Sequence, residues 1–131
     1  MESIQTLMEE SAQDAVNYAN ENYEVVLDYS FDSVKSADAI VQLLSDTVID
    51  DQTMFTLSYI FGAYLGEVYR REREGEWLYV EATDSEPPQT FFKHGEKTFA
   101  LPSKVYHVLN GSSDETLTEY MWKLFDSSQT H

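Results

Sequence analysis

The side chains that could carry acid–base, nucleophilic or metal chemistry do not group into a known motif in this sequence. The three histidines, His94, His107 and His131, lack the H-x-x-x-H spacing that places two metal ligands on one helix face. Cysteine is absent, which excludes a thiolate nucleophile, a disulfide and a cysteine-based zinc site. No calcium-binding D-x-D-x-D-G loop, G-x-S-x-G elbow, phosphate-binding loop or dinucleotide fingerprint occurs. We therefore predict no catalytic residue, no metal site and no cofactor.

One carboxylate, Glu67, lies in an otherwise apolar stretch and is the best candidate for a catalytic acid or base. Such a group needs a partner, and Arg70 and Arg71 follow three and four residues later, the spacing of a helical salt bridge. We interpret Glu67 as a structural ion-pair residue. A small enzyme with a pocket beside Glu67, and with His94 or His107 opposite, is kept as an alternative.

The acids are remarkable for their number rather than their spacing. The chain has 24 Asp and Glu against 8 Lys and Arg, a net charge of −16, and thirteen of the acids but only Lys35 of the bases lie in residues 1–69. A net charge of roughly −2 to −8 is sufficient to keep a small domain soluble. The surplus indicates a basic partner, with a merely solvated acidic face as the alternative.

The acidic half is expected to form two amphipathic helices with their acids outward. Apolar residues recur at helical spacing in residues 2–21 and from Val34 to Val48. Residues 23–29 between them predict either a short strand or an extended connector. If the two helices pack side by side, their acids form one continuous negative surface, with Tyr18 and Tyr29 as aromatic anchors. The residues predicted to bind the partner are Glu10, Asp14, Tyr18, Glu21, Asp28, Tyr29, Asp38 and Asp46.

The remaining elements predict a third helix and a small sheet. Asp50 and Asp51 begin a helix that is apolar on nearly every face through Tyr69, which indicates a helix buried among others. Gly62 and Gly66 in this helix predict close approach of another element, because glycine costs about 1 kcal/mol relative to alanine in a helix. Three strands are expected at 77–82, 90–95 and 97–101. A helix should follow at 103–109, and a last helix capped by Asp114.

These patterns predict an α+β fold: one helix-rich domain over residues 1–126, with a central buried helix, a small antiparallel sheet of about three strands and a polar tail at 127–131. The N-terminal stretch lacks the basic and apolar regions of a secretion signal. The most apolar window, from Met54 to Leu65, is too short to span a bilayer. The acidic surface disfavours direct binding to nucleic acid or anionic lipid, so we expect a cytoplasmic protein that contacts neither.

The central helix also carries a resemblance. The stretch Phe61-Gly-Ala-Tyr-Leu-Gly-Glu-Val-Tyr-Arg-Arg71, followed by Gly75-Glu-Trp77, resembles a family of uncharacterised small bacterial proteins with a GAYLGEV-x-RR helix and a GGEW strand. Looser similarities extend it over about residues 12–125, at Leu27–Ser33, Thr98–Tyr106 and Asn110–Glu115. This chain departs from the pattern at Glu74-Gly75, where two glycines are usual. In size, acidity and lack of catalytic motifs, the family resembles the immunity proteins of bacterial toxin systems.

The favoured hypothesis is therefore a non-enzymatic, acidic immunity protein that occludes the basic active site of a cognate toxin. A phage-type mimic of nucleic acid that inhibits a nucleic-acid-binding enzyme is the first alternative, beside the enzyme alternative above. An adaptor that binds through exposed aromatic side chains is the third. The sequence leaves the toxin's identity and the oligomeric state open.

Overall fold

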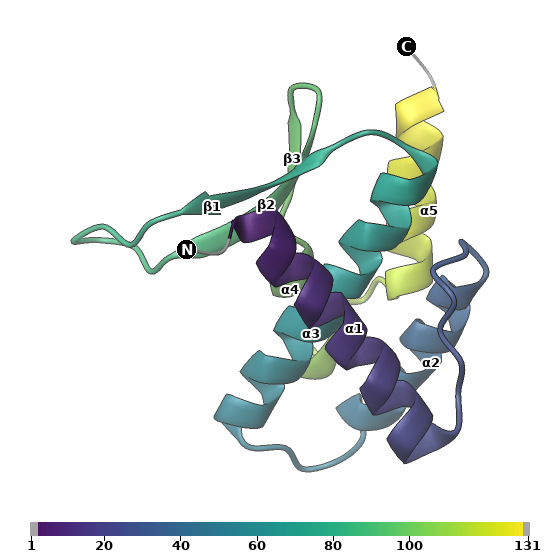
Figure 1. Ribbon diagram of the computed structural model, residues 1–131. Helices are drawn as coiled ribbons and strands as arrows, with labels where there is room; N and C mark the ends of the chain where they lie inside the picture. The colour runs from purple at the N-terminus through teal and green to yellow at the C-terminus, as the bar shows by residue number, and fades with distance from the viewer. Residues whose placement is uncertain (1–2, 130–131) are drawn as a thin grey trace.

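The computed structural model describes residues 3–129 and has the α+β architecture that the sequence predicts (Figure 1). The short sheet lies at one side of the five helices and projects beyond them, and the longest helix, α3, crosses the middle of the molecule. In chain order the elements are α1 (Ile4–Tyr23), α2 (Ser33–Ser45), α3 (Asp51–Glu72), β1 (Glu76–Val80), β2 (Gln89–His94), β3 (Lys97–Phe99), α4 (Leu101–Leu109) and α5 (Leu117–Gln129).

Helix α3 is the buried centre of the fold. It begins where the Asp50 side chain accepts a hydrogen bond from the Thr53 N–H at 2.7 Å. Every residue from Phe61 to Tyr69 is buried. Helices α1 and α4 pack against it, which explains why its sequence is apolar on nearly every face.

The two glycines of α3 mark its closest contacts. A Cβ atom on Gly62 would lie 2.6 Å from the Pro102 Cα atom at the start of α4. A Cβ atom on Gly66 would lie 2.2 Å from the Trp77 ring of β1. Since real Cβ contacts are never this short, the predicted close approach at both glycines is confirmed.

Helix α1 packs on α3 through a row of small residues. The row consists of Met8, Ala12, Ala15 and Ala19, all fully buried. Alanines at helical spacing let two backbones approach closely, so α1 follows α3 rather than α2. Helix α2 packs mainly on α4 and α5 instead. The expectation that the two acidic helices lie side by side is therefore wrong.

The segment before the second helix follows one of its two predicted alternatives, whereas the end of that helix differs from its prediction. Residues 24–28 form a connector and not a strand. Helix α2 ends at Ser45, so Val48, which was assigned to its buried stripe, is fully exposed in the following loop. The helix pattern of the sequence continued past the point at which the chain turns toward Asp50.

The three strands form an antiparallel sheet in the order β1-β2-β3. Trp77 of β1 lies opposite Phe92 of β2, and both rings are buried against α3. Strand β3 is short and pairs only with residues Phe92–His94 of β2. Residues 89–91 of β2 consequently pair with β1 on one side but with no strand on the other, within the residues that the structure describes.

The last helix differs from its prediction at both ends. Its first turn is capped by Thr116, whose hydroxyl accepts from the Glu119 N–H at 3.1 Å while the Glu119 carboxylate accepts from the Thr116 N–H at 3.0 Å. This reciprocal pair is a capping box, so the prediction that Asp114 caps the helix is wrong. Helix α5 continues to Gln129, so the predicted polar tail at 127–131 begins as helix, and its last two residues lie outside the described chain.

Candidate functional site

The clearest candidate for a binding surface is a row of acids along α1, which we call the α1 acidic stripe: Glu10, Asp14 and Glu21. All three are exposed, and they lie within about 40° of one another around the helix axis over a length of about 16 Å. They point away from the alanine row that packs on α3. None of the ion pairs found among the described residues involves any of the three. The stripe therefore presents uncompensated negative charge on a helix fixed by the core.

The neighbouring acid of α1, Glu9, is different because it faces a base. Its carboxylate lies 3.4 Å from the Arg70 guanidinium of α3. Arg70 also pairs with Glu67, and their hydrogen bond is the main reason that the pKa of Arg70 is raised. This contact offsets the charge of Glu9, so Glu9 is not counted in the α1 acidic stripe.

Asp38 was expected on the outer face of the second helix, and this placement is wrong. Its side chain is only 8% exposed and reaches across to the start of α5. The carboxylate accepts from the Leu117 N–H at 3.3 Å, from the Thr118 N–H at 3.1 Å and from the Thr118 hydroxyl at 2.7 Å. Asp38 is thus a tertiary cap of α5 and is not available to a partner.

The other two predicted acids, Asp28 and Asp46, are exposed but belong to segments outside α1. Asp28, in the connector, accepts hydrogen bonds from the Ser30 hydroxyl at 2.6 Å and from the Ser30 N–H at 3.0 Å. These bonds lower the pKa of Asp28, so it stays charged to a lower pH than usual. Asp46 lies directly after the last residue of α2.

The two predicted aromatic anchors, Tyr18 and Tyr29, are half-buried and already packed. Tyr18 meets Phe61 edge-on, with 6.0 Å between ring centroids, and burial is the main cause of its raised pKa. Tyr29 lies 4.9 Å from the Tyr64 ring, and the Arg71 guanidinium lies over it at 4.0 Å. Both rings therefore serve first to hold α1 and the connector on α3.

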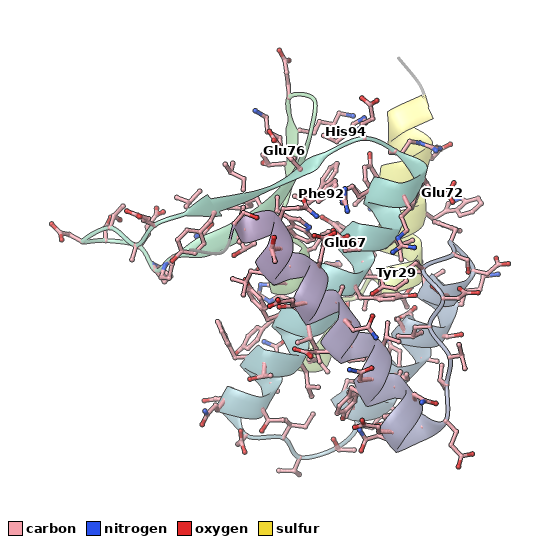
Figure 2. The ribbon with its side chains drawn as sticks, viewed as in Figure 1. Tyr29, Glu67, Glu72, Glu76, Phe92 and His94 are labelled. Atoms are coloured by element: carbon pink, nitrogen blue, oxygen red, sulfur yellow. The ribbon has the colours of Figure 1, made fainter. Side chains whose placement is uncertain are left out.

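The buried carboxylate Glu67 has a complete set of partners. It is 3% exposed, and it lies between α1, α3 and the sheet (Figure 2). Its oxygens accept from the Trp77 Nε1–H at 2.9 Å and from the Arg70 guanidinium at 3.1 and 3.2 Å. The predicted Glu67–Arg70 pair is therefore confirmed. Glu67 thus makes the structural ion pair that the sequence predicts, with the Trp77 indole as an additional donor.

Two of the three histidines, His94 and His107, lie within the described residues, and each contacts a neighbouring backbone or side-chain oxygen. His131 lies outside them. His94 Nδ1 contacts the Glu74 carbonyl oxygen, and His107 Nδ1 lies 2.9 Å from the Ser112 hydroxyl. The hydrogen bonds found for Glu67 among the described residues come from Gln5, Arg70 and Trp77, not from a histidine. Among the described residues, no group of three or more His, Cys, Asp or Glu side chains has the arrangement of a metal site. In the same part of the chain, no helix has the length and apolar character that crossing a membrane requires.

Sequence reasoning missed an apolar cleft of about 360 Å³ between the first half of α3, the start of α4 and the loop before β2. Aromatic and proline side chains form most of its wall: Phe55, Tyr59, Phe91, Tyr106, Pro87, Pro88 and Pro102. Phe55 is 67% exposed, although it belongs to a helix that reads as buried throughout. The Pro87-Pro88 pair was the available sequence signal, but only the tertiary structure brings it beside the exposed Phe55 ring.

Comparison with known proteins adds no relative. A scan against protein-family models, a search of curated proteins and a search of solved structures each returned no match. The resemblance to the small bacterial family with the GAYLGEV-x-RR signature therefore stays a prediction.

Proposed function

We propose that this chain is an acidic immunity protein that acts in the cytoplasm and neutralises a bacterial toxin with a basic surface. The observation that carries the proposal is the α1 acidic stripe, which holds three exposed carboxylates without a cationic partner among the described residues. A folded chain loses stability through self-repulsion when it keeps such charges together. A basic partner offsets that repulsion on binding.

The structure of α1 suits this role because its acids need no rearrangement on binding. Four buried residues anchor the helix on α3, and Ser3 caps its first turn by accepting from the Thr6 N–H at 3.1 Å. Preorganised charges lose little conformational entropy on association. Inhibition would follow from the stripe occupying a basic cleft of the toxin in place of its anionic substrate.

The structure also narrows the predicted set of binding residues. Asp38 is removed from it because it caps α5, and Tyr18 and Tyr29 can contribute only their exposed edges. Asp28 and Asp46 keep a minor role in the proposal, as exposed acids that add to the negative potential of the surface. The central contribution falls to Glu10, Asp14 and Glu21.

A growth-protection assay tests this function. The protein encoded by the neighbouring gene is expressed in a sensitive bacterium, alone or together with this chain. We expect rescue by the wild type and weaker rescue by the triple variant Glu10→Gln, Asp14→Asn, Glu21→Gln. No toxicity of the neighbour, or no rescue by the wild type, would reject the immunity function.

A charge-matched control isolates the position of the acids from their number. The triple variant Glu74→Gln, Glu96→Gln, Asp114→Asn removes the same charge from exposed sites outside α1 and outside the apolar cleft, and it should rescue like the wild type. If the neighbour is instead an enzyme that this chain displaces from DNA or RNA, the nucleic-acid-mimic alternative takes precedence.

A further inference from the structure

The apolar cleft beside α3 has an open strand edge along one wall. Residues 89–91 of β2 line the cleft, and on this side they pair with no strand among the described residues, because β3 ends at Phe99. After Phe99 the chain turns into α4, which forms the facing wall. An unpaired edge of this kind accepts an added extended strand through its backbone groups.

The other walls provide a place for a large apolar side chain. Phe55, Tyr59 and Tyr106 come from two helices and meet the Pro87-Pro88 loop around the cavity. Its volume of about 360 Å³ is at the lower end of the range for ligand pockets, ~300–1,000 Å³. Rings and prolines bind apolar side chains with little loss of conformational entropy, since they have few free torsions.

Acids near the cleft favour a segment that carries basic residues beside its apolar side chain. The loop between β1 and β2 that leads into the prolines carries three acids and no base: Glu81, Asp84 and Glu86. Asp51 lies one turn before Phe55 on α3 and is exposed. A second copy of this chain, with its charge of −16, is repelled from this rim.

We infer that the cleft binds an extended segment of a basic protein partner, which adds to the free edge of β2 and places one large apolar side chain, flanked by Lys or Arg, between Phe55, Tyr59 and Tyr106. The inference rests on the proposed function only in taking the partner to be a basic protein. It adds a second contact surface, formed by different elements from the α1 acidic stripe.

Selection from random peptides tests the inference without the toxin. A library of random heptapeptides displayed on phage is panned on the wild-type protein and counter-selected on Phe55→Ser. Phe55 is 67% exposed, so its replacement should leave the fold intact. The matched control is Val48→Ser, which removes a fully exposed apolar side chain outside the cleft.

We expect enrichment of sequences with an aromatic or large aliphatic residue next to Lys or Arg. The best of them, made synthetically, should shift the NMR signals of residues 89–91 saturably, and Phe55→Ser should weaken its binding about tenfold while Val48→Ser does not. Enrichment without basic residues, equal binding to Phe55→Ser, or no enrichment would overturn the inference. NMR shifts confined to α1 would also overturn the inference while leaving the proposed function intact. Concentration-dependent dimerisation through the cleft would overturn it as well, because the occupant of the cleft would then be a second copy of this chain.

Discussion

Replacing Asp38 by alanine removes the acceptor that joins α2 to the start of α5. The carboxylate accepts three hydrogen bonds from Leu117 and Thr118, which are 79 and 80 residues away in sequence. Without the carboxylate, the N–H groups of Leu117 and Thr118 in the first turn of α5 lose their acceptor. Asp38 is only 8% exposed, so water has little access to replace it. Hydrogen bonds to charged groups contribute about 1.5–3 kcal/mol, and loss of a helix cap costs about 0.5–2 kcal/mol.

These contributions overlap because one carboxylate makes all three bonds, so we expect a loss of about 2–4 kcal/mol in the free energy of unfolding. The assay is equilibrium urea unfolding followed by far-UV circular dichroism. Asp46→Ala is the matched control, since it removes an exposed acid just after the same helix and relieves the same self-repulsion. It should change the free energy by no more than about 0.5 kcal/mol.

Asp38→Asn provides a second reading of the same contact. It retains one carbonyl oxygen and should lose less stability than Asp38→Ala. Equal stability of Asp38→Ala and Asp46→Ala would refute the reasoning, because it would mean that the carboxylate does not cap α5. It would also return Asp38 to the set of residues available to a partner.

Three further predictions concern the packing and the pH dependence. Gly66→Ala should destabilise the protein by at least about 2 kcal/mol and change the near-UV circular dichroism, because the new methyl group would overlap the Trp77 ring, 2.2 Å away; an unchanged spectrum would contradict the close approach. Tyr64→Phe should cost about 1–3 kcal/mol in urea unfolding, since its hydroxyl accepts the Tyr29 N–H at 2.8 Å, whereas a neutral result would show that water replaces it. Hydrogen bonds from Lys123 and Lys104 lower the pKa of Glu115 below 4.5, so its contribution is present above that pH and disappears as the pH falls through the lower folded-state pKa. Glu115→Gln should therefore destabilise at pH 7 and not at about pH 2, and an equal effect at both pH values would exclude the ionic contribution.

The helices and strands were predictable because their signals are local. Two helices, α1 and α3, follow directly from the apolar period of residues 2–21 and from the continuous apolar run after Asp51. The contacts of Gly62 with Pro102 and of Gly66 with Trp77 show why these two positions of α3 require glycine. The first turn of α5 shows the limit of this reasoning. Thr116 and Asp114 are both good caps in sequence, and only the path of the chain decides between them.

The candidate site was predictable in part, for a different physical reason. Acids opposite a buried alanine row must face solvent, so the position of the α1 acidic stripe follows from periodicity alone. The inward turn of Asp38 does not, because its partner helix is 79 residues away and no local pattern encodes the packing of α2 on α5. The cleft was missed for the same reason, since its walls come from three separate parts of the chain.

The rate constant for association with the proposed toxin partner, measured at several salt concentrations, tests the central claim most directly. If the α1 acidic stripe steers a basic partner, the rate constant of the wild type falls steeply with added salt. At low salt, the triple variant Glu10→Gln, Asp14→Asn, Glu21→Gln should associate at least about tenfold more slowly than the triple control Glu74→Gln, Glu96→Gln, Asp114→Asn. Equal rate constants for the two variants, or a wild-type rate constant that does not respond to salt, would contradict the account.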